Sequence, residues 1–180
     1  TSKPTVTVSM DFYNEKRRLE LDVNKVDKDH HDHFLNGAIF EVYDKTIDSY
    51  VTTLASGQLM ITGEEKDEEY EISKKEDFTK IIKMVKTDEN KQIVLDIDDG
   101  TYYSRKVGDD KVTKHIVKDG KAVLADAIYG HEYEFKEIKA PTSYQLADKS
   151  KAYKVEADEE TDTIIYYFEN ARIVVPNTGV

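Results

Sequence analysis

Runs of alternating apolar and polar residues fill most of this 180-residue chain and recur at short, even intervals. Successive side chains of a β-strand point to opposite faces, so each run predicts a strand with one buried face. Turn signals separate the runs, as at Asp99-Gly100 and Asp119-Gly120. The predicted strands are residues 6–12, 19–26, 37–44, 57–63, 91–97, 100–107, 111–117, 121–128, 131–138, 151–157 and 162–170. Their even spacing predicts an all-β sandwich.

One segment departs from this pattern and predicts a helix. Ser73 and Glu76 have the spacing of a capping box, in which each side chain bonds a backbone N–H at the start of a helix. Beyond Ser73, apolar residues recur with a helical period: Phe78, Ile81, Ile82 and Val85. We therefore expect one short α-helix over about residues 74–86.

Three polar residues end alternating runs at positions that should be buried. Lys25 shares the parity of the apolar residues of 19–23, Glu137 shares that of Phe135, and Asn170 shares that of Phe168. An unpaired buried charge costs several kcal/mol, so these groups have to pair, shift their pKa values or react. Two interpretations follow. Lys25 and Glu137 form a buried salt bridge with Asn170 hydrogen-bonded nearby, or the three residues make a covalent bond.

Composition excludes several classes of function. A formal charge of −11 argues against nucleic acid or an anionic membrane as partner. The chain has no cysteine, so it has no disulfide, thiolate metal site or cysteine nucleophile. The run DKDHHDH, residues 27–33, contains side chains that bind zinc or nickel, but such runs are usually solvated turns, and we predict no metal and no cofactor. No stretch is long enough for a transmembrane helix, and no nucleophile-elbow sequence indicates a hydrolase.

Three ordered motifs carry a family resemblance. LDVNKVDKD followed by FLNGAIFEVYD, then GKAVLADAIYGHEYEFKEIKAPTSYQL, then YYFENAR, together resemble a Cna B-type (collagen-adhesin B) repeat, found in surface adhesins and pilins of Gram-positive bacteria. The resemblance covers about residues 19–44 and 119–172 and includes the E-box around Glu137. Ser143 and Ile128 depart from the usual pattern, and residues 45–118 find no counterpart.

The resemblance implies an Ig-like or prealbumin-like β-sandwich over residues 17–172, with an insertion at about 45–118 that contains the expected helix. The chain also has a faint internal repeat, because VTVSMDFYNEKR near the start is similar to TDTIIYYFENAR near the end. Residues 1–16 are therefore predicted to be the last strand of a preceding repeat, or a linker derived from it.

The resemblance also implies a self-crosslinking reaction. The amine of Lys25 attacks the carboxamide of Asn170, ammonia leaves, and an isopeptide bond remains, with Glu137 as the proton shuttle. A nucleophilic lysine has to be neutral, which burial favours. Lys28 has the opposite parity and is a weaker candidate for the nucleophile. The reaction occurs once per molecule, so the chain is not expected to be an enzyme.

The C-terminal residues resemble a sortase sorting motif. In VPNTG, residues Val175, Pro176, Asn177, Thr178 and Gly179, valine replaces the leading leucine of LPXTG. Region 173–180 would then be cleaved by sortase and joined to cell-wall peptidoglycan or another pilin subunit, outside the cell. The leading interpretation is a structural stalk domain of a wall-anchored adhesin or pilin. The alternative is an adhesin module that binds a host protein or glycan through residues 45–118.

Overall fold

A computed structural model describes residues 16–175, and within that range the chain is built from strands without a helix. The strands are β1 (Arg18–Asp27), β2 (Ile39–Asp44), β3 (Ser49–Ala55), β4 (Leu59–Thr62), β5 (Glu69–Ser73), β6 (Ile81–Lys86), β7 (Gln92–Leu95), β8 (Gly100–Lys106), β9 (Thr113–Val117), β10 (Lys121–Ile128), β11 (Glu132–Lys139), β12 (Lys151–Lys154) and β13 (Thr163–Asn170). The predicted all-β class is confirmed. Since no helix is present, none of the described segments is a helix that could span a membrane.

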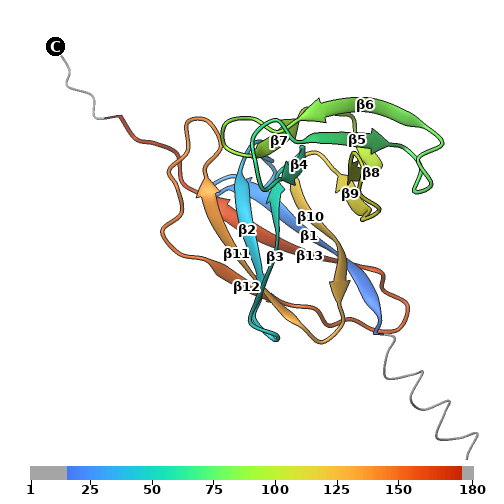
Figure 1. Ribbon diagram of the computed structural model, residues 1–180. Coiled ribbons are helices and arrows are strands. Elements are labelled where there is room, and N and C mark those ends of the chain that lie inside the picture. The colour runs from blue at the N-terminus through green and yellow to red at the C-terminus, as the bar shows by residue number, and fades with distance from the viewer. Residues whose placement is uncertain (1–15, 176–180) are drawn as a thin grey trace, which may run out of the picture.

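Two sheets form a sandwich (Figure 1). One sheet has the order β10-β1-β13 and the other the order β12-β11-β2-β3. β1 lies in the middle of its sheet, antiparallel to β10 and parallel to β13. Apolar side chains from both sheets fill the space between them: Leu19, Leu21, Val23, Ala38, Phe40, Val42, Ala122, Leu124, Ala127, Tyr133, Phe135, Tyr153, Val155 and Phe168. The ring of Phe40 meets Phe135 and Phe168 edge-on, so aromatic contacts join the two layers.

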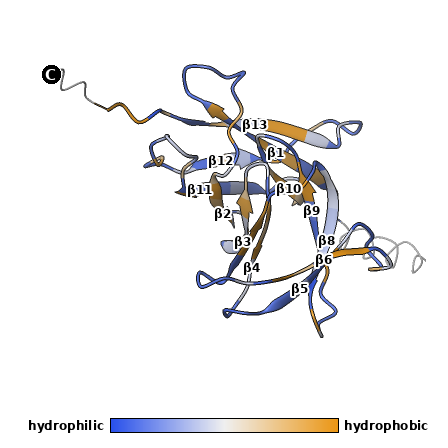
Figure 2. Ribbon diagram, turned by 90° about the horizontal axis from the view of Figure 1, so that it is seen from above, coloured by the Kyte–Doolittle hydropathy of each residue, from blue (hydrophilic) through white to orange (hydrophobic). Residues whose placement is uncertain are grey.

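Strands β4 to β9 form a separate lobe beside one end of the sandwich (Figure 1). It contains a β4-β7 ribbon and a sheet of order β6-β5-β8-β9. A second apolar core holds the lobe together: Leu59, Ile61, Ile72, Ile93, Tyr102 and Val117. β3 falls within residues 45–118 but pairs with β2, so the lobe's own strands begin at β4. In Figure 2 the loops are largely hydrophilic and the apolar residues concentrate in the strands.

The helix expected over 74–86 is wrong. Residues 74–80 form a turn between β5 and β6, which pair as an antiparallel hairpin. The Ser73 hydroxyl does not begin a helix, because it accepts a bond from Lys75 N at 3.0 Å and lies 3.0 Å from Lys80 O, so it closes the turn. Phe78 has a left-handed φ of +57°, which interrupts any helical run.

Tertiary packing decides this hairpin. The apolar residues that suggested one buried helical face are not all buried, since Phe78 is buried while Ile81 and Ile82 are exposed. Val85 instead packs against the lobe core beside Tyr70, its partner across the hairpin. Pairing with β5 gives the backbone of β6 its hydrogen bonds, and the β-branched residues suit a strand.

Candidate functional site

Lys25 lies inside the sandwich, near the end of β1, with no exposed surface. It sits on the central strand β1, opposite Phe168 of the neighbouring parallel strand β13. Its ammonium donates to Phe168 O at 3.0 Å and lies 3.4 Å from Val26 O. Parity therefore placed this residue correctly: the same face that buries Leu21 and Val23 buries the lysine.

Burial changes the acidity of Lys25. It lowers the pKa of the ammonium from the usual 10.5 to about 8, because the charged form loses its hydration. The carboxylates of Glu137, Glu169 and Asp27 oppose this shift, and the positive charge of Lys151 adds to it. A sizeable fraction of Lys25 is therefore neutral at mildly alkaline pH.

Asn170 and Glu137 meet in the same interior. Asn170 follows Phe168 by two residues on β13 and so shares its face, while Glu137 comes from β11 of the opposite sheet. The Asn170 amide nitrogen donates to Glu137 Oε1 at 2.6 Å and to Gln145 O at 2.6 Å. Both side chains are at least 97% buried. The structure thus brings Lys25, Asn170 and Glu137 to one end of the sandwich core.

Two atoms of this cluster have no hydrogen-bond partner among the described residues. They are Asn170 Oδ1 and Glu137 Oε2, and both are buried. Lys25 and Glu137 form no ion pair within 4.0 Å in the described part of the chain. The structure therefore lacks the buried salt bridge between these two residues that the first interpretation requires. Buried polar groups are nearly always hydrogen-bonded, so these two unbonded atoms need a specific explanation.

Residues 141–147, which connect β11 toward β12, hold both Asn170 and Glu137 in place. Besides the bond from Asn170 to Gln145 O, the backbone N–H of Ala147 donates to Glu137 Oε1 at 2.9 Å. This 141–147 segment pairs with the chain just beyond β13: Gln145 N donates to Ala171 O at 2.8 Å. The segment therefore contacts both the carboxamide and the carboxyl group through its backbone.

Asp27 anchors this arrangement to β1, and the sequence analysis missed it. Its Oδ2 accepts from the Tyr144 hydroxyl at 2.6 Å and from Arg172 Nε at 2.9 Å, and its Oδ1 accepts from Asp29 N at 2.8 Å. The Tyr144 hydroxyl, Arg172 and that N–H hold the pKa of Asp27 well below its usual range. The sequence held a signal for it, because Asp27 has the same parity as Lys25; the structure shows Asp27 to be 1% exposed.

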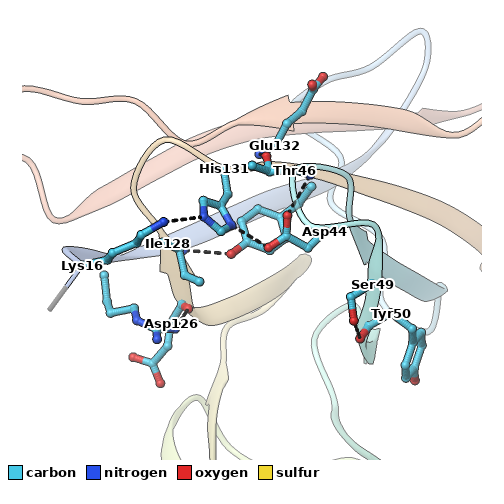
Figure 3. Close-up of polar contacts among 11 residues, drawn as sticks. Lys16, Asp44, Thr46, Ser49, Tyr50, Asp126, Ile128, His131 and Glu132 are labelled. Atoms are coloured by element: carbon cyan, nitrogen blue, oxygen red, sulfur yellow. Dashed lines mark hydrogen bonds and ion pairs between the residues drawn. The ribbon is translucent and has the colours of Figure 1, made fainter. Parts of the chain in front are cut away.

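A second polar cluster lies around the β10–β11 turn (Figure 3). The buried His131 bonds Asp44 Oδ2 through Nδ1 at 2.7 Å, and its Nε2 lies 3.4 Å from the Lys16 ammonium. Asp44 also accepts from Thr46 N at 3.0 Å. Tyr133 accepts from the backbone N–H of Ile128 at 2.9 Å. This cluster fastens the ends of β2, β10 and β11 to one another and was not foreseen from the sequence.

The histidine-rich run lies at the surface. His31 pairs with Glu169 and stacks on Tyr167 with a 5.6 Å centroid distance. Residues 16–175 contain no group of three or more His, Cys, Asp or Glu side chains placed to hold a metal ion. Lys28 is exposed in the turn that follows β1.

The sorting motif falls mostly outside the described residues. Val175 is 80% exposed at the end of the described chain, whereas Pro176, Asn177, Thr178 and Gly179 lie beyond it. Residues 1–15, most of the predicted preceding strand or linker, also lie outside the described range.

Solved pilin structures resemble the chain at low identity. The minor pilin GBS52 of Streptococcus agalactiae is 19% identical with a TM-score of 0.42, over 92% of this chain and 49% of that one. The pilus 2b backbone protein of group B streptococcus is 17% identical with a TM-score of 0.41, over 87% of this chain and 42% of that one. The major pilin SpaD of Corynebacterium diphtheriae is 16% identical with a TM-score of 0.36, over 89% of this chain and 32% of that one. The chain thus spans about half the length, or less, of these proteins.

Comparison with curated proteins finds no match. A family model described as "SpaA: Prealbumin-like fold domain" matches residues 80–172. The matched stretch includes Glu137 and Asn170 and begins within residues 45–118, for which the sequence analysis found no counterpart. It covers β10, β11 and β13, which form much of the sandwich, and more than half of the chain. The chain therefore belongs to the SpaA prealbumin-like fold domain family.

Proposed function

We propose that this domain is a structural module of an extracellular, wall-anchored surface protein, a pilin or adhesin, that crosslinks itself between Lys25 and Asn170. One observation carries the proposal. A fully buried lysine, with no carboxylate within ion-pair distance among residues 16–175, lies on the strand next to that of an asparagine whose amide nitrogen is bonded to a buried glutamate. A buried ammonium without a counterion destabilises a folded core, whereas an amide bond removes its charge.

The chemistry balances without a cofactor. Neutral Lys25 attacks the carbonyl carbon of Asn170, and the proton that the amine loses passes to Glu137. Glu137 Oε1 lies 2.6 Å from the amide nitrogen of Asn170, the leaving group, so it can deliver that proton there. The products are a secondary amide and ammonia, and Glu137 returns to its starting state. Burial supplies the neutral amine, because it lowers the pKa of Lys25 to about 8.

The bond would have a mechanical use. It would join the first strand of the sandwich to the last, and in Figure 1 the start of β1 and the chain beyond β13 lie at opposite ends of the sandwich. A pull on the two ends would then run through β1 as far as Lys25, the crosslink, and the chain that follows Asn170. The described strands from β2 to β13 lie within the bridged loop and would not be extended.

The test is the intact mass of the denatured protein. The wild type is expected to lack the mass of one ammonia, and Glu137→Ala is expected to have its full calculated mass. Glu134→Ala is the matched control, because Glu134 lies on the same strand but is half-exposed and outside the cluster. Peptide mapping should then recover Lys25 joined to Asn170. Full calculated mass in the wild type contradicts the proposal.

Anchoring forms a second part of the proposal. We propose that sortase cleaves between Thr178 and Gly179 and joins the chain to peptidoglycan or to another pilin subunit. Val174 and Val175, which lead into the motif, are about four-fifths exposed, which supports access by sortase. Incubation with sortase and an amine nucleophile should label the wild type, and Thr178→Ala should abolish labelling. Equal labelling of both would contradict this assignment.

An adhesin role is the alternative, and β6 is the observation that favours it. β6 lies at the edge of the lobe's sheet and exposes Ile82 and Met84 by 42% and 51%. Figure 2 shows β6 as a hydrophobic strand on the outside of the molecule. Exposed apolar edges can bind extended segments of other proteins. Loss of binding to a host protein or glycan in an Ile82→Lys, Met84→Lys variant that still crosslinks would support this role.

A further inference from the structure

We infer that Tyr144 and Asp27 are positioning residues for the crosslinking reaction: they lock the 141–147 segment against β1, and the backbone of that segment aims the Asn170 carboxamide and Glu137. The inference rests on the proposed function. It concerns neither the nucleophile, nor the acceptor, nor the proton shuttle.

The 141–147 segment supplies bonds to both reacting partners. Gln145 O accepts from the Asn170 amide nitrogen at 2.6 Å, and Ala147 N–H donates to Glu137 Oε1 at 2.9 Å. The first bond fixes the rotation of the carboxamide, since a carbonyl acceptor holds the nitrogen and leaves Oδ1 directed elsewhere. The second holds the carboxyl oxygen that faces the leaving group. A small shift of the segment would move both groups relative to Lys25.

Among residues 16–175, the segment is part of none of the strands. Only Tyr144 takes part in an isolated bridge, with Arg172, and Ser143 adopts a left-handed φ of +72°, a conformation that is strained outside glycine. Two backbone bonds to residues 171–173 fasten it on one side. On the other side its attachment is the Tyr144 hydroxyl, which donates to Asp27 Oδ2 at 2.6 Å.

Asp27 is well suited to be the fixed end of this link. It is almost fully buried and ends β1, the central strand that also carries Lys25. In the parallel register it stands opposite Asn170. Its carboxylate accepts three bonds, two of them from Tyr144 and Arg172, and bonds to a charged acceptor are stronger than neutral ones. The bond between Tyr144 and Asp27 thus ties the segment to β1, the strand that carries the nucleophile. All three reacting groups are then held by one connected set of hydrogen bonds and strands.

The experiment compares two tyrosine variants in the full chain. Tyr144→Phe removes the hydroxyl that reaches Asp27. Tyr153→Phe is the matched control, since the buried Tyr153 also donates one hydroxyl bond, to Tyr167 O at 2.8 Å, but that bond involves neither the 141–147 segment nor a reacting group. Each protein is made in a short pulse of cell-free synthesis, and the fraction that has lost ammonia is followed by mass over time.

We expect Tyr144→Phe to slow the crosslinking by about ten- to a hundredfold, because small displacements of reacting groups have effects of that size. Tyr153→Phe should react at the wild-type rate even where its thermal stability falls equally. Asp27→Asn keeps an oxygen that can accept the hydroxyl bond, so it should react faster than Asp27→Ala.

A second readout follows the carboxamide directly. In a Lys25→Met background, which cannot crosslink, the Asn170 side-chain NH₂ should exchange slowly with solvent, as expected for two short bonds. Adding Tyr144→Phe should speed that exchange while the backbone amides of β1 stay protected. A merely structural role for Tyr144 would change both sets of amides together.

The outcomes separate the two claims. A wild type of full calculated mass would overturn the proposed function and this inference with it. A crosslinked wild type with Tyr144→Phe reacting at the same rate, or with Tyr153→Phe slowed equally, would overturn the positioning role and leave the crosslink standing.

Discussion

At the scale of single residues, the alternation of strand side chains was enough to locate the buried cluster. Lys25, Glu137 and Asn170 each stood on a face that the neighbouring apolar residues required to be buried, and all three are buried. Asp27 carried the same signal but was not recognised. His131 and Asp44 also have the parity of buried neighbours, Tyr133 and Val42, but parity could not show that they meet, because they are 87 positions apart.

Lys25 should make stability depend on pH when it cannot react. In an Asn170→Ala variant the folded pKa of about 8 lies below the unfolded value of 10.5, so between these pH values the unfolded chain binds more protons. Stability should therefore rise with pH across this window, by about 3 kcal/mol in all. Urea unfolding between pH 8 and 10 measures the rise.

The matched control is Lys25→Met with Asn170→Ala, which keeps every other titrating group. Those groups include Glu137, Glu169, Asp27 and Lys151, whose charges act on Lys25 from β11, β13, β1 and β12. The difference between the two variants isolates the lysine. Parallel stability curves for the two would show that Lys25 titrates normally and is not buried as described.

The His131–Asp44 pair makes a prediction about stability. Asp44→Ala leaves the buried Nδ1 of His131 and the N–H of Thr46 without their acceptor. The exposed Thr46 N–H can bond water instead, but the unpaired buried nitrogen of His131 costs about 1–3 kcal/mol, so the free energy of unfolding should fall by about that amount. Glu41→Ala, which removes an exposed carboxylate from the same strand β2, is the control and should change stability little. Equal effects would mean that the pair contributes nothing specific.

At the scale of elements, alternation identified the strands of the sandwich except β3, and missed β5 and β6 in the lobe. The sequence of β3, SYVTTLA, hides its alternation because Thr52 and Thr53 occupy both faces. β5 is rich in glutamate, and β6 carries apolar residues whose spacing also fits a helix. Local propensity cannot decide between a helix and an edge strand where the choice depends on a partner strand, here β5.

Ser73 should contribute more to the stability of the lobe than a surface serine does. Its hydroxyl bonds Lys75 and Lys80 within the turn, and the residue is fully buried. Ser73→Ala should therefore cost about 1–3 kcal/mol. Thr79→Ala, which removes an exposed bond to Asp77 in the same turn, should cost less than about 0.5 kcal/mol. Hydrogen exchange of the β5 and β6 amides measures both. A helical far-UV spectrum in either protein would contradict the hairpin.

At the scale of the whole molecule, β1 is buried on both faces, which its alternation could not predict. Asp22 and Asn24 point away from the sandwich core yet are at most 4% exposed. Lys118, at the end of the lobe, pairs with Asp22 and Glu20, and Lys121 bonds Asn24 at 2.6 Å. Burial and the neighbouring Glu20 raise the pKa of Asp22 to about 6. The lobe is therefore joined to the strand that carries Lys25 by a partly buried ionic contact.

The proposed crosslink makes its largest prediction under force. Between Lys25 and Asn170 lie 170 minus 25, or 145, residue steps. At about 3.4 Å per extended residue, unfolding them lengthens an uncrosslinked chain by about 500 Å. Single molecules of Glu137→Ala pulled from both ends should show this extension, and the wild type should not, because the amide bond carries the tension past the loop. Glu134→Ala should behave as the wild type. A long extension in molecules whose mass has fallen by one ammonia would mean that the bond joins a different pair of residues.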